Sequence, residues 1–140
     1  NYITIHISSG LNALKEAKKV SGKTKIVGVT ILTSLDNKLL SEIGYNKAVK
    51  SIVIKQAKLA KKANLDAIVC SPMEVNLVKK IFKKEIITPG IRFNSKNNDQ
   101  KRTLTPKQAY KNGSDWLVIG RPITKGNIKR NIKTLIDHLY

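Results

Sequence analysis

Two glycine–arginine loops are the parts of this sequence best suited to bind an anion. Gly90 and Arg92 follow the run Glu-Ile-Ile-Thr, and Gly120 and Arg121 follow the run Trp-Leu-Val-Ile. A guanidinium presents planar N–H donors that match a phosphate group, and a glycine lets a ligand approach the backbone closely. Either arginine alone could be a solvated turn residue, but the two loops together indicate a phosphate site.

The elements that must position these loops alternate between strands and helices. Short, near-continuously apolar runs are typical of parallel strands covered on both faces. Apolar residues at helical spacing, with capping and proline signals, predict helices between them. We expect strands at residues 2–7, 25–32, 67–70, 85–88 and 116–119. We expect helices at residues 11–20 and 45–63. A capping box at residues 71–74 predicts a helix that ends at about residue 82, and a second capping box predicts a helix over residues 105–113. The last helix is expected from about residue 127 to the end.

This order predicts an α/β fold with a parallel sheet and right-handed crossovers. It fits an open doubly wound sheet or part of a (β/α)8 barrel, and periodicity does not choose between them. No linker, low-complexity tract or internal repeat divides residues 1–140, so we expect a single domain. Ligands of both folds bind at the carboxyl ends of the strands. We therefore expect Thr33, which follows the second strand, on the same face as the two glycine–arginine loops.

The net charge of +18, from 27 basic and 9 acidic residues, raises a second interpretation, in which the partner is a polyanion such as nucleic acid. Lysines concentrate in residues 55–62 and 79–84, but aromatic residues make up only 5% of the chain and do not interleave with them. We favour lysines spread over solvated helix faces in a chain with the Lys/Asn/Ile bias of an AT-rich genome. Nucleic acid is not the expected partner, although such a field attracts phosphate ligands.

Cysteine usage and hydropathy bear on the compartment. The single cysteine, Cys70, excludes an internal disulfide framework and fits a reducing cytoplasm. No apolar run approaches the ~20 residues that span a bilayer, and the chain opens without a signal-peptide pattern. We therefore expect a cytoplasmic protein with no membrane partner.

Longer motifs, in matching order and spacing, resemble those of bacterial orotidine 5'-phosphate decarboxylases. Residues 87–92 read Ile-Thr-Pro-Gly-Ile-Arg, residues 99–102 read Asp-Gln-Lys-Arg, and residues 118–124 read Val-Ile-Gly-Arg-Pro-Ile-Thr. Upstream, residues 5–10, 28–34 and 65–71 also match strand segments of the family. The resemblance covers essentially the whole chain. It implies five β/α units of a (β/α)8 TIM barrel, from the C-terminal portion of such an enzyme.

The loops of that family hold the nucleotide of orotidine monophosphate or of the product, uridine monophosphate. The resemblance implies that Arg121 and the backbone amide of Gly120 bind the phosphate, and that Arg92 lies in the same nucleotide site. It also implies that Gln100, on a loop that closes over the ligand, reaches the phosphate and the base.

The remaining substrate-binding residues carried over by the resemblance are Thr33, near the base and ribose, and Pro89, which shapes the pocket wall. The family reaction is a decarboxylation of the pyrimidine ring that needs no cofactor or metal. Full-length members of the family are expected to be homodimers.

Catalysis in the family needs an Asp-x-Lys-x-x-Asp segment, in which a carboxylate destabilises the substrate carboxylate and a lysine protonates the developing carbanion. Residues 36–41 read Asp-Asn-Lys-Leu-Leu-Ser, and residues 99–104 read Asp-Gln-Lys-Arg-Thr-Leu. Both imitate the segment but lack its second aspartate. We therefore expect no catalytic residue in this chain and no activity of the chain alone.

The match begins at what the family would count as its fourth strand, and five units would not close a barrel of eight. We expect a fragment of a longer protein, a split-gene product that pairs with a separate N-terminal fragment, or a decayed gene. The sequence leaves these three open. Another phosphate-binding barrel, such as a relative of hexulose-phosphate synthase, fits the two loops but fits residues 88–92 and 99–102 poorly.

Overall fold

Five parallel strands form one sheet in the computed structural model, which describes residues 1–93 and 102–139. The strands are β1 (Tyr2–His6), β2 (Lys25–Val29), β3 (Ala67–Val69), β4 (Glu85–Thr88) and β5 (Trp116–Leu117). They lie side by side in chain order, β1-β2-β3-β4-β5. Consecutive strands of a (β/α)8 barrel have this order, whereas a doubly wound sheet reverses its order partway. The predicted α/β fold is confirmed, and the strand order selects barrel units over the doubly wound sheet.

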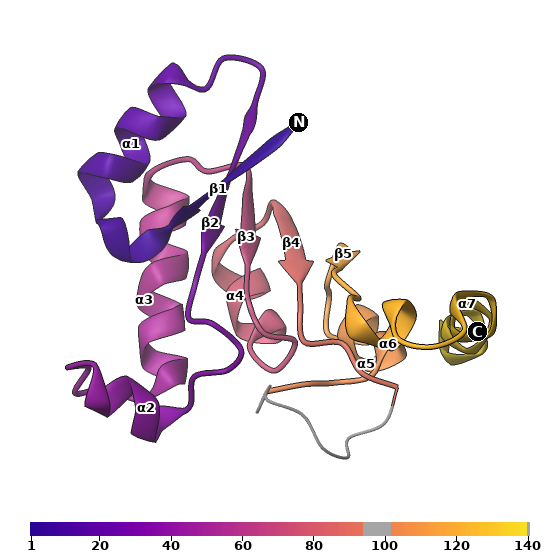
Figure 1. Cartoon of the computed structure of the whole chain (residues 1–140). Helices are drawn as coiled ribbons and strands as arrows, with labels where there is room; N and C mark the ends of the chain where they lie inside the picture. The colour runs from indigo at the N-terminus through magenta and orange to yellow at the C-terminus, as the bar shows by residue number, and fades with distance from the viewer. Residues whose placement is uncertain (94–101, 140) are drawn as a thin grey trace.

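The helices gather on one side of the strands, as Figure 1 shows for α1, α3 and α4. Right-handed crossovers between consecutive strands all return over the same face. The bounds are η1 (Ile7–Ser9), α1 (Leu11–Val20), α2 (Asn37–Glu42), α3 (Val49–Lys62), α4 (Val75–Ile81), α5 (Pro106–Lys111), α6 (Arg121–Thr124) and α7 (Ile128–Leu139). Within the described ranges, no helix combines the length and apolar character that crossing a membrane requires.

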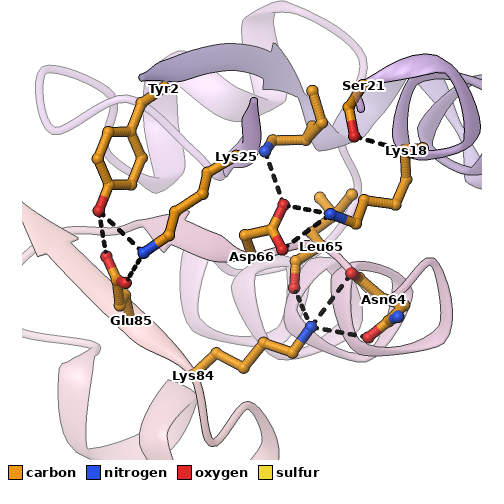
Figure 2. A network of polar contacts seen from close by, with 10 residues as sticks. Tyr2, Lys18, Ser21, Lys25, Asn64, Leu65, Asp66, Lys84 and Glu85 are labelled. Carbon is orange, nitrogen blue, oxygen red and sulfur yellow. Dashed lines mark hydrogen bonds and ion pairs between the residues drawn. The ribbon is translucent and has the colours of Figure 1, made fainter. Parts of the chain in front are cut away.

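Alternate strand residues divide between the two faces of the sheet, as the pleat of a strand dictates. Ile26, Ile68 and Ile86 point toward the helices and are at most 4% exposed, in a core shared with α1, α3 and α4. The other face, which a barrel would enclose, carries an ion pair between Lys25 and Glu85 (Figure 2). The sheet therefore has one apolar face that is buried against the helices and one face that bears polar groups.

Aspartates tie together the amino-terminal ends of neighbouring strands. Asp66, just before β3, accepts the N–H of Ile26 over 2.8 Å and pairs with Lys18 of α1 at 2.6 Å (Figure 2). Asp115, just before β5, accepts a β4 N–H over 2.7 Å and pairs with Lys79 of α4 at 2.7 Å. Each aspartate thus joins one strand to its neighbour and to a helix.

Several element boundaries differ from the predicted ones. β2 ends at Val29 rather than at residue 32, because its partner β3 ends opposite it at Val69. β1, β3 and β5 also end one or two residues early. α3 begins at Val49 rather than at residue 45, where the Asn37 side chain accepts the Val49 N–H over 2.9 Å. The short helices η1, α2 and α6 were not predicted, because a turn or two carries too few residues to show a period.

The two predicted capping boxes have different outcomes. At the start of α5, Thr105 accepts the N–H of Gln108 over 3.3 Å, and Gln108 Oε1 accepts the Thr105 N–H over 3.1 Å, as predicted. The box at Ser71 is wrong, since α4 begins later and has no side-chain cap. Glu74, which that box would use, instead forms an ion pair with Arg102.

Candidate functional site

A pocket of about 280 Å³ lies at the carboxyl ends of β2, β3 and β4. Its lining residues are Val29, Ile31, Leu32, Thr33, Ser34, Val69, Cys70, Ser71 and Pro89. Thr33 follows β2 and Pro89 follows β4, and β3 lies between those two strands. The fold therefore brings these two predicted nucleotide-site residues into one pocket, although they are far apart in the sequence.

Apolar side chains and hydroxyl groups make up this pocket, with hydroxyls from Thr33, Ser34 and Ser71. Burial raises the pKa of the Cys70 thiol, and the Glu74 carboxylate adds to the increase. The thiol is therefore protonated at neutral pH and is not a nucleophile. The lining residues include no carboxylate, amine or imidazole. Such a pocket suits a planar ring or a sugar, but its lining supplies no general acid or base.

The loop after β4 packs tightly around Gly90, whose φ is +77°. Residues other than glycine rarely adopt this backbone conformation. A β-carbon on Gly90 would lie 3.1 Å from the backbone oxygen of Arg102 and 3.3 Å from Thr33 Cγ2. Arg92 is 8% exposed, and its Nη1 donates to the Ile91 carbonyl over 2.7 Å. Arg92 is thus buried in this loop and does not join the residues that line the pocket.

Gly120 and Arg121 mark the junction between β5 and α6, and both are exposed. β5 pairs with β4 through Leu117 and Thr88, so this junction lies beside the loop that follows β4. Backbone N–H groups at the start of a helix lack intrahelical partners and attract anions. A β-carbon on Gly120 would meet no atom within 4 Å. The two glycine–arginine loops are therefore neighbours, although neither Gly120 nor Arg121 lines the 280 Å³ pocket.

Gln100 and Arg102 both belong to the Asp-Gln-Lys-Arg motif of residues 99–102. Gln100 lies outside the described residues. Arg102, which the sequence argument used only as part of a motif, is 7% exposed and lies directly behind the pocket wall. The sequence feature that could have identified Arg102 is its place as the charged residue that ends the Asp-Gln-x-Arg motif. In residues 1–93 and 102–139, no group of three or more His, Cys, Asp or Glu side chains could hold a metal ion.

Two curated relatives of this chain carry the name of the family that its sequence matches. The model of the family described as "Orotidine 5'-phosphate decarboxylase / HUMPS family" matches residues 1–132. The orotidine 5'-phosphate decarboxylase of Wolbachia sp. subsp. Brugia malayi is 51% identical over 138 residues, which are 96% of this chain and 61% of that protein. The protein of the same name from Actinobacillus pleuropneumoniae serotype 5b is 44% identical over 131 residues, 88% of this chain and 57% of that protein.

Solved structures are similar as well. Orotidine 5'-phosphate decarboxylase from Lactobacillus acidophilus has a TM-score of 0.79 and 30% identity, covering 99% of this chain and 63% of that chain. The Methanocaldococcus jannaschii enzyme complexed with inhibitor BMP has a TM-score of 0.73 at 22% identity, which shows the shared fold alone. The chain spans 61% and 57% of the two curated relatives described above. Since the family model matches most of its residues, the chain belongs to the orotidine 5'-phosphate decarboxylase / HUMPS family.

Proposed function

We propose that this chain is the nucleotide-binding portion of an orotidine 5'-phosphate decarboxylase, which converts orotidine monophosphate to uridine monophosphate and CO2. One observation carries the proposal. The pairing of β4 with β5 sets the Gly90 and Gly120 loops side by side, next to a pocket that contains Thr33. The 51% identity to a relative of that name supports this reaction over that of another sugar-phosphate barrel.

The phosphate would bind at the junction between β5 and α6. Arg121 would donate charge-assisted hydrogen bonds to it, and the backbone amide of Gly120 would donate another. Arg92 is proposed to lie in the same nucleotide site, and Gln100 is proposed to reach the phosphate and the base. The net charge of +18 favours the approach of a nucleotide that carries negative charge.

The base and ribose would occupy the pocket beside Thr33, with Pro89 forming part of its wall. The Thr33 hydroxyl can donate or accept a hydrogen bond, as a pyrimidine ring or a ribose hydroxyl requires. Only 7% of Thr33 is exposed, so a hydrogen bond made by its hydroxyl would be largely shielded from water.

The catalytic carboxylates and lysine are proposed to come from outside these 140 residues, which contain no Asp-x-Lys-x-x-Asp segment. Asp36 is the first residue of the similar stretch at residues 36–41, but its side chain caps α2 by accepting the Leu39 N–H over 2.9 Å. We further propose that the units carrying the catalytic segment, in the same or a separate polypeptide, join this chain in a cytoplasmic homodimer.

Calorimetric titration of the chain with uridine monophosphate tests the phosphate assignment. We expect Arg121→Ala to weaken binding by about 10-fold to 100-fold, because a hydrogen bond to a charged group contributes about 1.5–3 kcal/mol. Lys125→Ala is the matched control, since Lys125 is an exposed cation at the other end of the same short helix. Equal affinities for the unaltered chain and Arg121→Ala would show that the assignment is wrong.

A further inference from the structure

Arg102 and Glu74 form an ion pair buried behind the candidate site. Both residues are 7% exposed, and Arg102 Nη1 lies 2.7 Å from Glu74 Oε2. Charged side chains are almost never buried unless they are paired, because removing them from water is costly. A well-packed apolar pair often serves stability equally well. The presence of charges at this place therefore points to a role beyond packing.

The second nitrogen of the guanidinium holds the chain that follows β2. Arg102 Nη2 donates to the carbonyl oxygens of Ile31 over 3.0 Å and Leu32 over 2.8 Å. β2 ends at Val29, so these two carbonyls lie beyond the strand. Ile31 and Leu32 line the candidate pocket together with Thr33, the next residue in the chain. One side chain thus fixes the backbone of the pocket wall from behind.

The segments that follow β3 and β4 also lie close to Arg102. The backbone oxygen of Arg102 accepts a hydrogen bond from Ser71 Oγ, beyond β3, over 3.3 Å. It also lies 3.1 Å from the place where a β-carbon of Gly90, beyond β4, would stand. The segments that follow β2 and β3 are therefore joined through hydrogen bonds to Arg102, and the segment that follows β4 packs closely against it. All three segments contribute residues to one pocket.

We propose that Arg102, held in place by Glu74, is a positioning residue that sets the location of Thr33 in the nucleotide site. The ligand in this inference rests on the proposed function, but the geometry does not. The planar guanidinium pairs with a carboxylate through one nitrogen and donates N–H groups to two carbonyls through another. The single ammonium of a lysine cannot reproduce that arrangement. Arg102 acts through Ile31 and Leu32 and need not touch the ligand.

Amide hydrogen exchange tests the positioning without any ligand. The Leu35 N–H donates to the Leu32 carbonyl over 3.0 Å, so its exchange reports on the segment that Arg102 holds. The paired variant Arg102→Met/Glu74→Met keeps an apolar pair of similar volume and leaves no unpaired charge. We expect Leu35 to exchange at least about tenfold faster in this variant, because local opening becomes easier.

The Asp66 amide serves as the internal control, since it donates to Ile26 at the opposite end of the strands over 3.0 Å. We expect its exchange rate to stay within about twofold of that in the unaltered chain, which would show that the variant is folded. Unchanged exchange at Leu35, or equal acceleration at Leu35 and Asp66, would overturn the positioning role.

Binding measurements separate positioning from general stability. We expect the paired variant to bind uridine monophosphate about tenfold more weakly but inorganic phosphate unchanged, because Thr33 is proposed to lie at the base and ribose rather than at the phosphate. Arg102→Lys keeps the positive charge but loses the planar set of guanidinium donors. We expect its affinities for the two ligands to resemble those of the paired variant. Equal losses for both ligands, or none for the nucleotide, would contradict the inference. If the unaltered chain did not bind uridine monophosphate, the proposed function would fail, and the exchange result would still decide the positioning role.

Discussion

Gly90 couples the shape of the β4 loop to the wall of the candidate pocket. Its φ of +77° turns the chain after β4, and the missing β-carbon leaves room for Thr33 and for the Arg102 backbone. Gly44 also has a positive φ, +88°, but a β-carbon there would meet no atom within 4 Å. These two glycines therefore separate the cost of backbone conformation from the cost of crowding.

Gly90→Ala is expected to lower the free energy of unfolding by roughly 2–4 kcal/mol. About 1–2 kcal/mol comes from forcing an L-residue to positive φ, and the rest comes from crowding against the backbone oxygen of Arg102. Gly44→Ala should lower it by only about 1–2 kcal/mol, because it carries the first cost alone. Urea unfolding of both variants measures the difference. Equal losses would mean that the β4 loop relaxes freely and is not a rigid part of the site.

The amino-terminal ends of the strands are organised by half-buried or exposed acids and by lysines from α1, α4 and the segment just before β4. Figure 2 shows Lys18 against Asp66, and Lys84 against Asn64 and Leu65. Lys84 Nζ donates to the backbone oxygen of Leu65 over 2.9 Å and to Asn64 Oδ1 over 2.7 Å, just beyond the end of α3. Cations are favoured at the carboxyl end of a helix. Part of the lysine cluster at residues 79–84 is therefore used to join elements.

The Asp66 carboxylate should make stability depend on pH in the acid range. Burial raises its pKa, but the Lys18 ammonium and the Ile26 N–H together outweigh burial, so the folded-state pKa lies below the ordinary value of 3.8. A depressed pKa gives stability that is complete well above pH 3.8 and is lost as the pH falls through the folded-state value. Asp66→Asn should remove part of that acid-range slope in urea unfolding.

At neutral pH the same substitution should lower the free energy of unfolding by about 1.5–3 kcal/mol, the usual range for hydrogen bonds to a charged group. Asp137→Asn, at an exposed position of α7, is the control and should change stability by less than about 0.5 kcal/mol. An unchanged acid-range slope in Asp66→Asn would show that other carboxylates control acid unfolding.

The distribution of charge over the whole molecule agrees with a ligand that is a small anion. Lys18, Lys25, Lys79 and Lys84 make ion pairs or hydrogen bonds within the chain. Lysines of α3 such as Lys58 and Lys61 are exposed on its outer face. They are spread over a helix surface and are not joined to a platform of aromatic rings, which single-stranded nucleic acid would require. Under the proposed function, the positive field would attract phosphate to the strand ends.

The chain alone should show no measurable decarboxylation of orotidine monophosphate, because its 140 residues lack the Asp-x-Lys-x-x-Asp segment. The measurement is loss of the orotate absorbance at saturating substrate, with uridine monophosphate binding followed in parallel as proof of an intact site. Binding without turnover is the expected result. Turnover that disappears in Asp36→Asn would show instead that residues 36–41 carry the chemistry.

The sequence by itself determined the alternation of strands and helices, the family and the identity of the two glycine–arginine loops. Apolar runs and helical periods are local, so short-range reasoning located all five strands, although most of them end earlier than predicted. Strand ends depend on the length of the neighbouring strand, as at Val29 and Val69. No local pattern contains that information.

Periodicity left a doubly wound sheet and barrel units open, and the family resemblance implied barrel units. The strand order confirms the barrel units, because it is a long-range property that only the tertiary structure shows. The tertiary structure also decided which expected site residues meet. Thr33 and Pro89 share a pocket, whereas Arg92 is buried in its own loop and Arg121 lies beyond the pocket lining. Glu74 gave a plausible capping box in sequence, yet its carboxylate turns to Arg102, 28 positions along the chain. A buried charge must find its partner in space, and the sequence does not record that distance.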